Sequence, residues 1–204
     1  MRRFASSLAA AAALCSCATV AELTRELESK PVCCKSPAEF KYQPLDSAGP
    51  ASFTLGEGSP VYAFDSGRSY FKAYALPEPL AARKLRVRSS PTGSTAFETK
   101  RWSQAYCPQV TFLDAEHRVL ASTSRIPDIV PATLLLSFVA DFDVPPAARY
   151  VVLHSDPRYY GTSSAVRYTA GGTYLVGNSV VTQPGGEAIR HPCAPIADAQ
   201  VELR

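Results

Sequence analysis

From Phe53 to the C-terminus, short runs of alternating apolar and polar residues are separated by turn residues. The clearest alternation is "ARKLRVRSS" at 82–90, where Leu85 and Val87 are flanked by basic residues that face the other way. In "RSYFKAYALP" at 68–77, one set of alternate positions carries tyrosines and a lysine. The other set carries phenylalanine and alanine. A period of two residues is typical of a strand whose two faces have different surroundings. The pattern therefore predicts strands for this part of the chain.

Other strands are predicted wherever such runs are bounded by glycine, proline or polar turns. Residues 109–123 predict a hairpin whose turn lies near Asp114, Ala115 and Glu116. The remaining predicted strands are "SFTL" at 52–55, "PVYAF" at 60–64, "ATLLLSFVADF" at 132–142, "PPAARYVVLHS" at 145–155, "AVRYTA" at 165–170, "TYLVG" at 173–177 and "SVVTQP" at 179–184. Turns that recur about every 8–12 residues are typical of a sandwich or barrel.

These strands predict an all-β fold, an antiparallel jelly-roll-like β-sandwich that occupies residues 53–204 as one domain. The composition agrees, because 17 Pro, 10 Tyr and 9 Phe favour strands and turns over helices. No internal repeat or low-complexity linker divides this region. We therefore expect a single large core.

The N-terminus has the features of an export signal. Arg2 and Arg3 precede an apolar segment that ends at Leu14 and is too short to span a bilayer. "LCSC" at 14–17 resembles the bacterial lipobox, which implies that residues 1–16 are removed and that Cys17 is lipidated. Ala18 rather than Asp follows Cys17, which favours periplasm-facing attachment to the outer membrane. A conventional signal peptide, cleaved near Ser16 or Ala18, is the alternative.

Residues 17–52 are predicted to form a tether and an N-terminal arm. The segment 18–30 predicts a short helix with Leu23 and Leu27 on one face, and 31–52 is irregular and rich in Pro, Ser and Gly. Without Arg2 and Arg3, 19 basic residues face 18 acidic ones, so the charge does not favour nucleic-acid binding. No later apolar run reaches the length of a membrane span.

Four cysteines remain beyond the leader and Cys17, which allows three disulfide connectivities in an oxidising compartment. We favour Cys107–Cys193, which would stabilise the fold by about 4 kcal/mol through loop closure. Cys33 and Cys34 would then be an adjacent disulfide or free thiols. The crossed pairings, which would join the arm to the body twice, stay open. The scattered histidines and the absence of C-x-x-C give no metal site.

Two stretches, "CCKSPAEFKYQPL" at 33–45 and "VYAFDSGRSYFKAYALP" at 61–77, resemble the MalM family of maltose operon periplasmic proteins. "VTFLDAEHRVL" at 110–120 is similar to the later core of that family. The resemblance implies a non-catalytic periplasmic protein connected with maltose or maltodextrin transport. The order of the strands is also similar to jelly-roll modules of secreted enzymes, which supports the fold but supplies no ligand.

No catalytic motif is evident. "GTSSA" at 161–165 lacks the nucleophile pattern of serine hydrolases, and the acidic pairs Asp141/Asp143 and Asp114/Glu116 are typical of turns and solvated strands. Two aspartates also supply too few oxygens for calcium. We therefore expect no enzyme activity, no cofactor and no metal.

Sugar binding needs flat aromatic rings and a few polar groups. The candidate residues are Trp102 and Tyr106 in "KRWSQAYC" and Tyr159 and Tyr160 in "DPRYYGTSS". The basic face of 84–88 has two interpretations, namely a solvated face that protects an edge or a contact with anionic envelope polymers. The partners we expect are the membrane, through the N-terminal lipid, and either carbohydrate or envelope proteins.

Overall fold

The computed structural model describes residues 19–46, 49–80, 84–91, 104–131, 136–168, 172–176, 179–183, 185–186 and 188–204. The predicted leader at 1–16, the lipidation site Cys17 and the candidate Trp102 lie outside these residues. Strands make up 52% of the chain, in several sheets with one α-helix, so the expectation of an all-β fold is confirmed. Among the described residues, no helix combines the length and apolar character that crossing a membrane requires.

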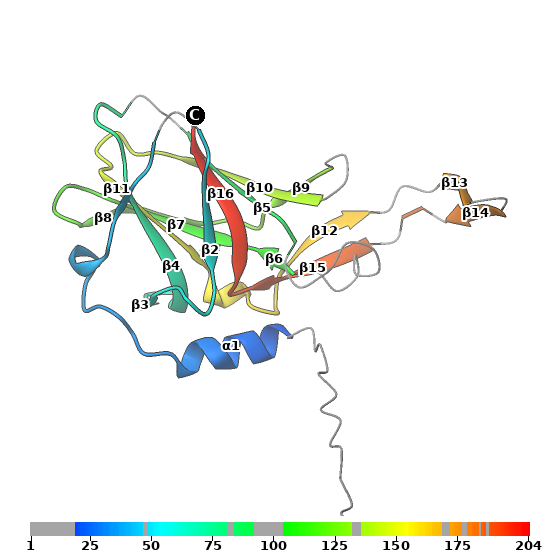
Figure 1. Cartoon of the computed structure of the whole chain (residues 1–204), viewed down its shortest axis with the longest axis horizontal. Coiled ribbons are helices and arrows are strands. Elements are labelled where there is room, and N and C mark those ends of the chain that lie inside the picture. The colour runs from blue at the N-terminus through cyan, green and yellow to red at the C-terminus, as the bar shows by residue number, and fades with distance from the viewer. Residues whose placement is uncertain are drawn as a thin grey trace, which may run out of the picture.

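Two large sheets dominate the fold (Figure 1). The first has the order β1-β4-β11-β7-β8, and β3 also pairs with β4. Its strands are β1 (Gln43–Pro44), β3 (Val61–Phe64), β4 (Gly67–Ala75), β7 (Pro108–Leu113), β8 (Val119–Ser124) and β11 (Tyr150–Ser155). The second has the order β2-β16-β5-β10-β9. Its strands are β2 (Ala51–Leu55), β5 (Lys84–Ser89), β9 (Asp128–Pro131), β10 (Leu136–Asp143) and β16 (Ala197–Leu203).

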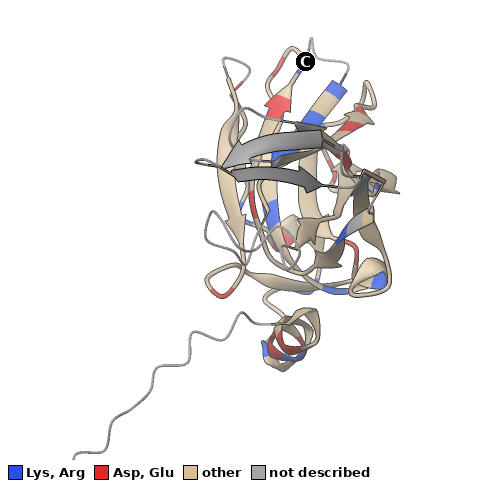
Figure 2. Ribbon diagram, turned by 90° about the vertical axis from the view of Figure 1, so that its right-hand side faces the viewer, with Lys and Arg blue, Asp and Glu red and all other residues tan. Residues whose placement is uncertain are grey.

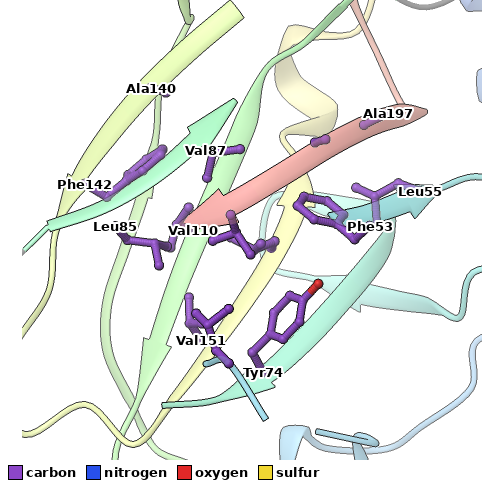
Figure 3. Packing of buried hydrophobic residues seen from close by; sticks show 14 of the residues in the cluster. Phe53, Leu55, Tyr74, Leu85, Val87, Val110, Ala140, Phe142, Val151 and Ala197 are labelled. Atoms are coloured by element: carbon purple, nitrogen blue, oxygen red, sulfur yellow. The ribbon is translucent and has the colours of Figure 1, made fainter. Parts of the chain in front are cut away.

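The main hydrophobic core is built from side chains of both sheets. Figure 3 shows Tyr74 and Val151 of the first sheet near Phe53 and Leu85 of the second. Alternation produces this arrangement, because Leu85 and Val87 are buried on β5 while the basic residues that alternate with them face outward. The predicted faces of this strand therefore agree with the structure.

A second cluster covers the opposite face of the first sheet. Phe71 and Ala73 of β4 point away from the main core and pack with Phe40 of the arm. The centroids of the Phe40 and Phe71 rings are 4.2 Å apart, and Tyr42 and Tyr62 pack around them. The arm that follows the helix is therefore part of the folded body.

The helix α1 (Val20–Ser29) lies across one end of the sheets (Figure 1). Thr19 and Glu22 form a capping box, which satisfies two free backbone N–H groups at the start of the helix. Leu27 is completely buried in the main core. The short helix predicted for 18–30 is present, and its buried face attaches it to the body.

Two smaller sheets complete the described strands. β12 (Ser164–Tyr168), β15 (Ala188–Ala194) and β6 (Ala105–Tyr106) form one sheet, and β13 (Gly172–Val176) pairs with β14 (Ser179–Gln183). Short 3-10 helices span Pro37–Glu39 and Pro157–Tyr159. The sequence prediction missed β15 and β16, although β16 lies between β2 and β5.

Two disulfides are present. Cys107 and Cys193 are joined within a fully buried cluster, with 5.5 Å between their Cα atoms, as expected. The neighbouring residues Cys33 and Cys34 are joined to each other. Of the arrangements left open by the sequence, the structure therefore has the adjacent pair and not the crossed pairings.

Candidate functional site

The four aromatic residues proposed for sugar binding do not form an open surface among the described residues. Trp102 lies outside them. Tyr106 is only 1% exposed, and its hydroxyl donates a hydrogen bond to the His154 carbonyl at 3.2 Å. The prediction for Tyr106 is therefore wrong, because a ring packed in the core leaves no face open to a sugar.

Tyr159 and Tyr160 also face inward. Tyr160 packs against the main core, and its hydroxyl lies 3.2 Å from the Ser69 hydroxyl. Burial raises the pKa of Tyr160. Tyr159 packs against the cluster around the Cys107–Cys193 disulfide. Both tyrosines are partly buried and contribute to the packing of these clusters.

Two basic residues of β5 pair with acidic residues of the neighbouring strand. Register places Arg86 opposite Asp141 and Lys84 opposite Asp143. Arg86 donates two hydrogen bonds to Asp141, at 2.7 Å from Nε and 2.6 Å from Nη2. These bonds lower the pKa of Asp141. Figure 2 shows that basic and acidic residues are interspersed along the strands. Lys84 and Arg86 therefore form ion pairs on this face, whereas Arg88 lies opposite Val139.

The other acidic pair closes a turn. Arg118 binds Asp114 through its backbone N–H and its guanidinium, and also contacts Glu116. Desolvation raises the pKa of Asp114, but the hydrogen bonds from Arg118 outweigh it and the pKa is lowered. Both carboxylates thus have structural partners. Among the described residues, no group of three or more potential ligands is placed to hold a metal ion.

The most suitable site is a groove at one edge of β4. β1 and β3 both bond to the edge of β4 that lies opposite β11, because Leu45 N–H donates to the Ala75 carbonyl and Phe71 N–H donates to the Pro60 carbonyl. The pairing of β3 ends at Tyr70, and that of β1 begins at Tyr74. The gap between the two short strands leaves residues 71–73 of β4 as the floor of a hollow.

We call this hollow the β4-edge groove. Its volume is about 640 Å³, which lies within the range of small-molecule sites. Its floor is Phe71, and its walls include Cys33 and Cys34 from the arm and the loop 57–60 between β2 and β3. The polar residues that line it include Glu39, Lys41, Gln43, Glu57 and Lys72.

Polar side chains around the groove have unused hydrogen-bonding capacity. Within the described part of the chain, Gln43, Glu57 and Lys72 make no side-chain hydrogen bond or ion pair. Ser59 differs, because its hydroxyl donates to the Thr54 carbonyl and accepts from Gly56 N–H, which fixes the loop. The groove therefore combines a braced wall with side chains that can bind polar groups of a ligand.

Lys72 occupies an unusual position. It alternates with Tyr70 and Tyr74, which belong to the main core, and lies opposite Leu153 of β11. Instead of being covered, Lys72 lines both the groove and a second hollow of about 770 Å³. The second hollow also contains Asp198 and Arg88, so the two hollows meet at the loop 57–60.

No protein-family model matches the chain, and no curated protein or solved structure is significantly similar to it.

Sequence reasoning missed this groove because its walls come from the arm and from a loop. One signal was present, since Lys72 is the charged member of an otherwise aromatic and apolar face of β4. A lysine at such a position needs either a partner or an opening at the edge of the sheet. The adjacent cysteines were the other signal.

Proposed function

We propose that the chain is a non-catalytic protein of the bacterial periplasm, of MalM type, that binds carbohydrate and assists maltose or maltodextrin transport. In this proposal residues 1–16 are a lipoprotein signal peptide, and lipidated Cys17 anchors a jelly-roll-like β-sandwich to the outer membrane. The MalM-like stretches at 33–45 and 61–77 support it, because both of them contribute walls or floor to the β4-edge groove.

The observation that carries the proposal is the set of unpaired polar groups beside an apolar wall. Sugars present hydroxyls that both donate and accept hydrogen bonds, together with less polar C–H faces. Gln43 offers a donor and an acceptor, Glu57 offers acceptors and Lys72 offers donors. The groove therefore matches the chemistry of a saccharide better than that of an apolar ligand.

A second candidate is an envelope protein that binds another protein. It is favoured by apolar side chains that are exposed along β8 and β9, at the edges of the two sheets. Val119 is 61% exposed, Leu120 40%, Ile126 47% and Val130 44%. Exposed apolar groups beside an edge strand are typical of contact surfaces.

The test is a titration of the full-length chain, in a detergent without a sugar headgroup, with maltotriose and longer maltodextrins. Calorimetry measures Kd, and saturation-transfer NMR detects weak contacts with the sugar. We expect saturable binding, about tenfold weaker in Lys72→Ala and unchanged in Lys35→Ala, whose lysine lies outside the groove.

The absence of heat and of saturation transfer with every maltodextrin at millimolar concentration would contradict the proposal. That result would favour the protein-binding candidate. That candidate predicts that Val119→Lys abolishes cross-linking to an envelope partner in cells, whereas Lys72→Ala does not.

A further inference from the structure

We propose that the disulfide of Cys33 and Cys34 is the contact surface on which the less polar face of one neutral pyranose unit packs. This inference rests on the proposed function, since it names the part of the groove that receives the sugar. It also defines the class of ligand as an uncharged saccharide.

The disulfide has the chemistry of a rigid apolar plate. Joining neighbouring cysteines closes an eight-membered ring through the backbone, and the two Cα atoms are 3.8 Å apart. Sulfur is polarizable and only a weak hydrogen-bond acceptor. Because the ring has no freely rotating side chain, a ligand that packs on it does not incur the usual cost of ordering a rotamer.

The plate is held in place from one side and open on the other. Cys33 N–H donates a hydrogen bond to the Val61 carbonyl at 2.9 Å, which attaches it to β3. Cys34 packs against the cluster of Phe40 and Phe71. Cys33 itself is exposed and lines the groove. The protein therefore stiffens the ring through Cys34 and presents Cys33 to solvent.

Three polar side chains line the same groove as the disulfide. Gln43, Glu57 and Lys72 come from three different segments around the same groove, and each lacks a partner among the described residues. A pyranose that lies flat on the ring directs its hydroxyls sideways and its C–H groups toward the sulfurs. The arrangement is therefore complementary to a sugar and not to a flat aromatic ligand, which has no such rim of donors and acceptors.

The charges around the groove favour a neutral ligand. Glu39 and Glu57 line it together with Lys41 and Lys72, so the charges cancel. A uronic acid or a phosphorylated sugar gains no net attraction from such a wall. The individual charged groups still serve as strong hydrogen-bond partners for hydroxyls.

The experiment compares the full-length wild type with Cys33→Ser/Cys34→Ser, which opens the ring but keeps two small side chains. Maltodextrins are the probes, in the same calorimetric and saturation-transfer measurements. We expect Kd to rise at least about tenfold, with saturation transfer lost from the sugar C–H protons. An unchanged Tm and far-UV circular dichroism spectrum would exclude a loss of the fold.

A second measurement avoids mutation. Cys107 and Cys193 are completely buried, whereas Cys33 is exposed, so mild reductant opens only the Cys33–Cys34 ring. Alkylation and mass spectrometry confirm which thiols are free. Reduced wild-type protein is expected to show the same loss of affinity as the double serine variant.

The outcomes separate the two proposals. If the wild type binds maltodextrin and its Kd stays the same after the ring is opened by both routes, the disulfide is not the contact surface for the sugar. The proposed function is then unaffected. Wild type that binds no glycan overturns both. A trigalacturonate that binds as tightly as maltotriose overturns the neutral class, because we expect the neutral sugar to bind at least about tenfold more tightly.

Discussion

His154 provides a sharp test of the packing of the first sheet. Its imidazole is fully buried and stacks on Phe64, with ring centroids 3.7 Å apart and an interplanar angle of 3°. Nδ1 lies 3.1 Å from the Ser155 carbonyl, which can only accept, so Nδ1 carries the proton of the neutral ring. Nε2 is buried and has no hydrogen-bond partner among the residues that the structure describes. Protonation would therefore place an unpaired charge in the interior.

The size of the effect follows from the pKa. Burial lowers the pKa of His154 from its ordinary value of 6.5 to about 4. The unfolded chain thus takes up a proton at higher pH than the folded chain does. Stability is complete above pH 6.5 and falls as the pH decreases through 4. The loss is about 1 kcal/mol at pH 5.5 and rises to about 3 kcal/mol at the acid limit.

The assay is urea unfolding followed by circular dichroism at about pH 7.5, 5.5 and 4.5. In His154→Phe, which keeps an aromatic ring beside Phe64, this loss between pH 7.5 and 4.5 should disappear. His117→Asn is the control, because His117 is partly exposed and Asn tolerates its φ of 62°. Parallel pH profiles for wild type and His154→Phe would refute the reasoning, as would loss of the pH dependence in the control.

Three further predictions concern stability. The double substitution Cys107→Ala/Cys193→Ala should lower the free energy of unfolding by about 4 kcal/mol, because the disulfide closes a loop with a sequence separation of 86. A loss below about 1 kcal/mol in urea unfolding would contradict this. A double-mutant cycle on Arg86 and Asp141 should give a coupling of about 0.5 kcal/mol, since both side chains are partly exposed, and about half a molar NaCl should weaken it. Leu27→Ala should reduce the protection of the helix amides by about 3 kcal/mol in hydrogen exchange. Equal loss of protection in the strands would show that the helix does not open separately.

The strands were predictable where large apolar and charged residues alternate. On β5 the contrast between Leu85 or Val87 and the basic residues fixed the buried face from sequence alone. The prediction failed for β16, where the inward residues include Ala197 and Ala199. Alanine gives little hydrophobic contrast, so the period of two residues is weak there. β16 is instead fixed in the sheet by its backbone pairing with both β2 and β5.

The candidate site depends more strongly on tertiary structure. The sequence identified Tyr106 as a sugar-binding residue because polar residues surround it, but β6 carries its ring into the core. The partner of Asp141 likewise became evident only in the structure, because β10 places it opposite Arg86. A residue's neighbours in sequence do not reveal which strand will lie beside it, and strand pairing decides both outcomes.

The sequence by itself determined the all-β class, the short helix before the strands and the faces of the strongly patterned strands. Local propensity and a period of two residues can be recognised within a single stretch of sequence, without knowing which strands lie beside it. Only the tertiary structure decided the pairing of Cys33 with Cys34 and the opening beside Lys72. The opening depends on β1 and β3 meeting the same edge of β4 with a gap between them. Such a gap arises from long-range register, which short stretches of sequence do not encode.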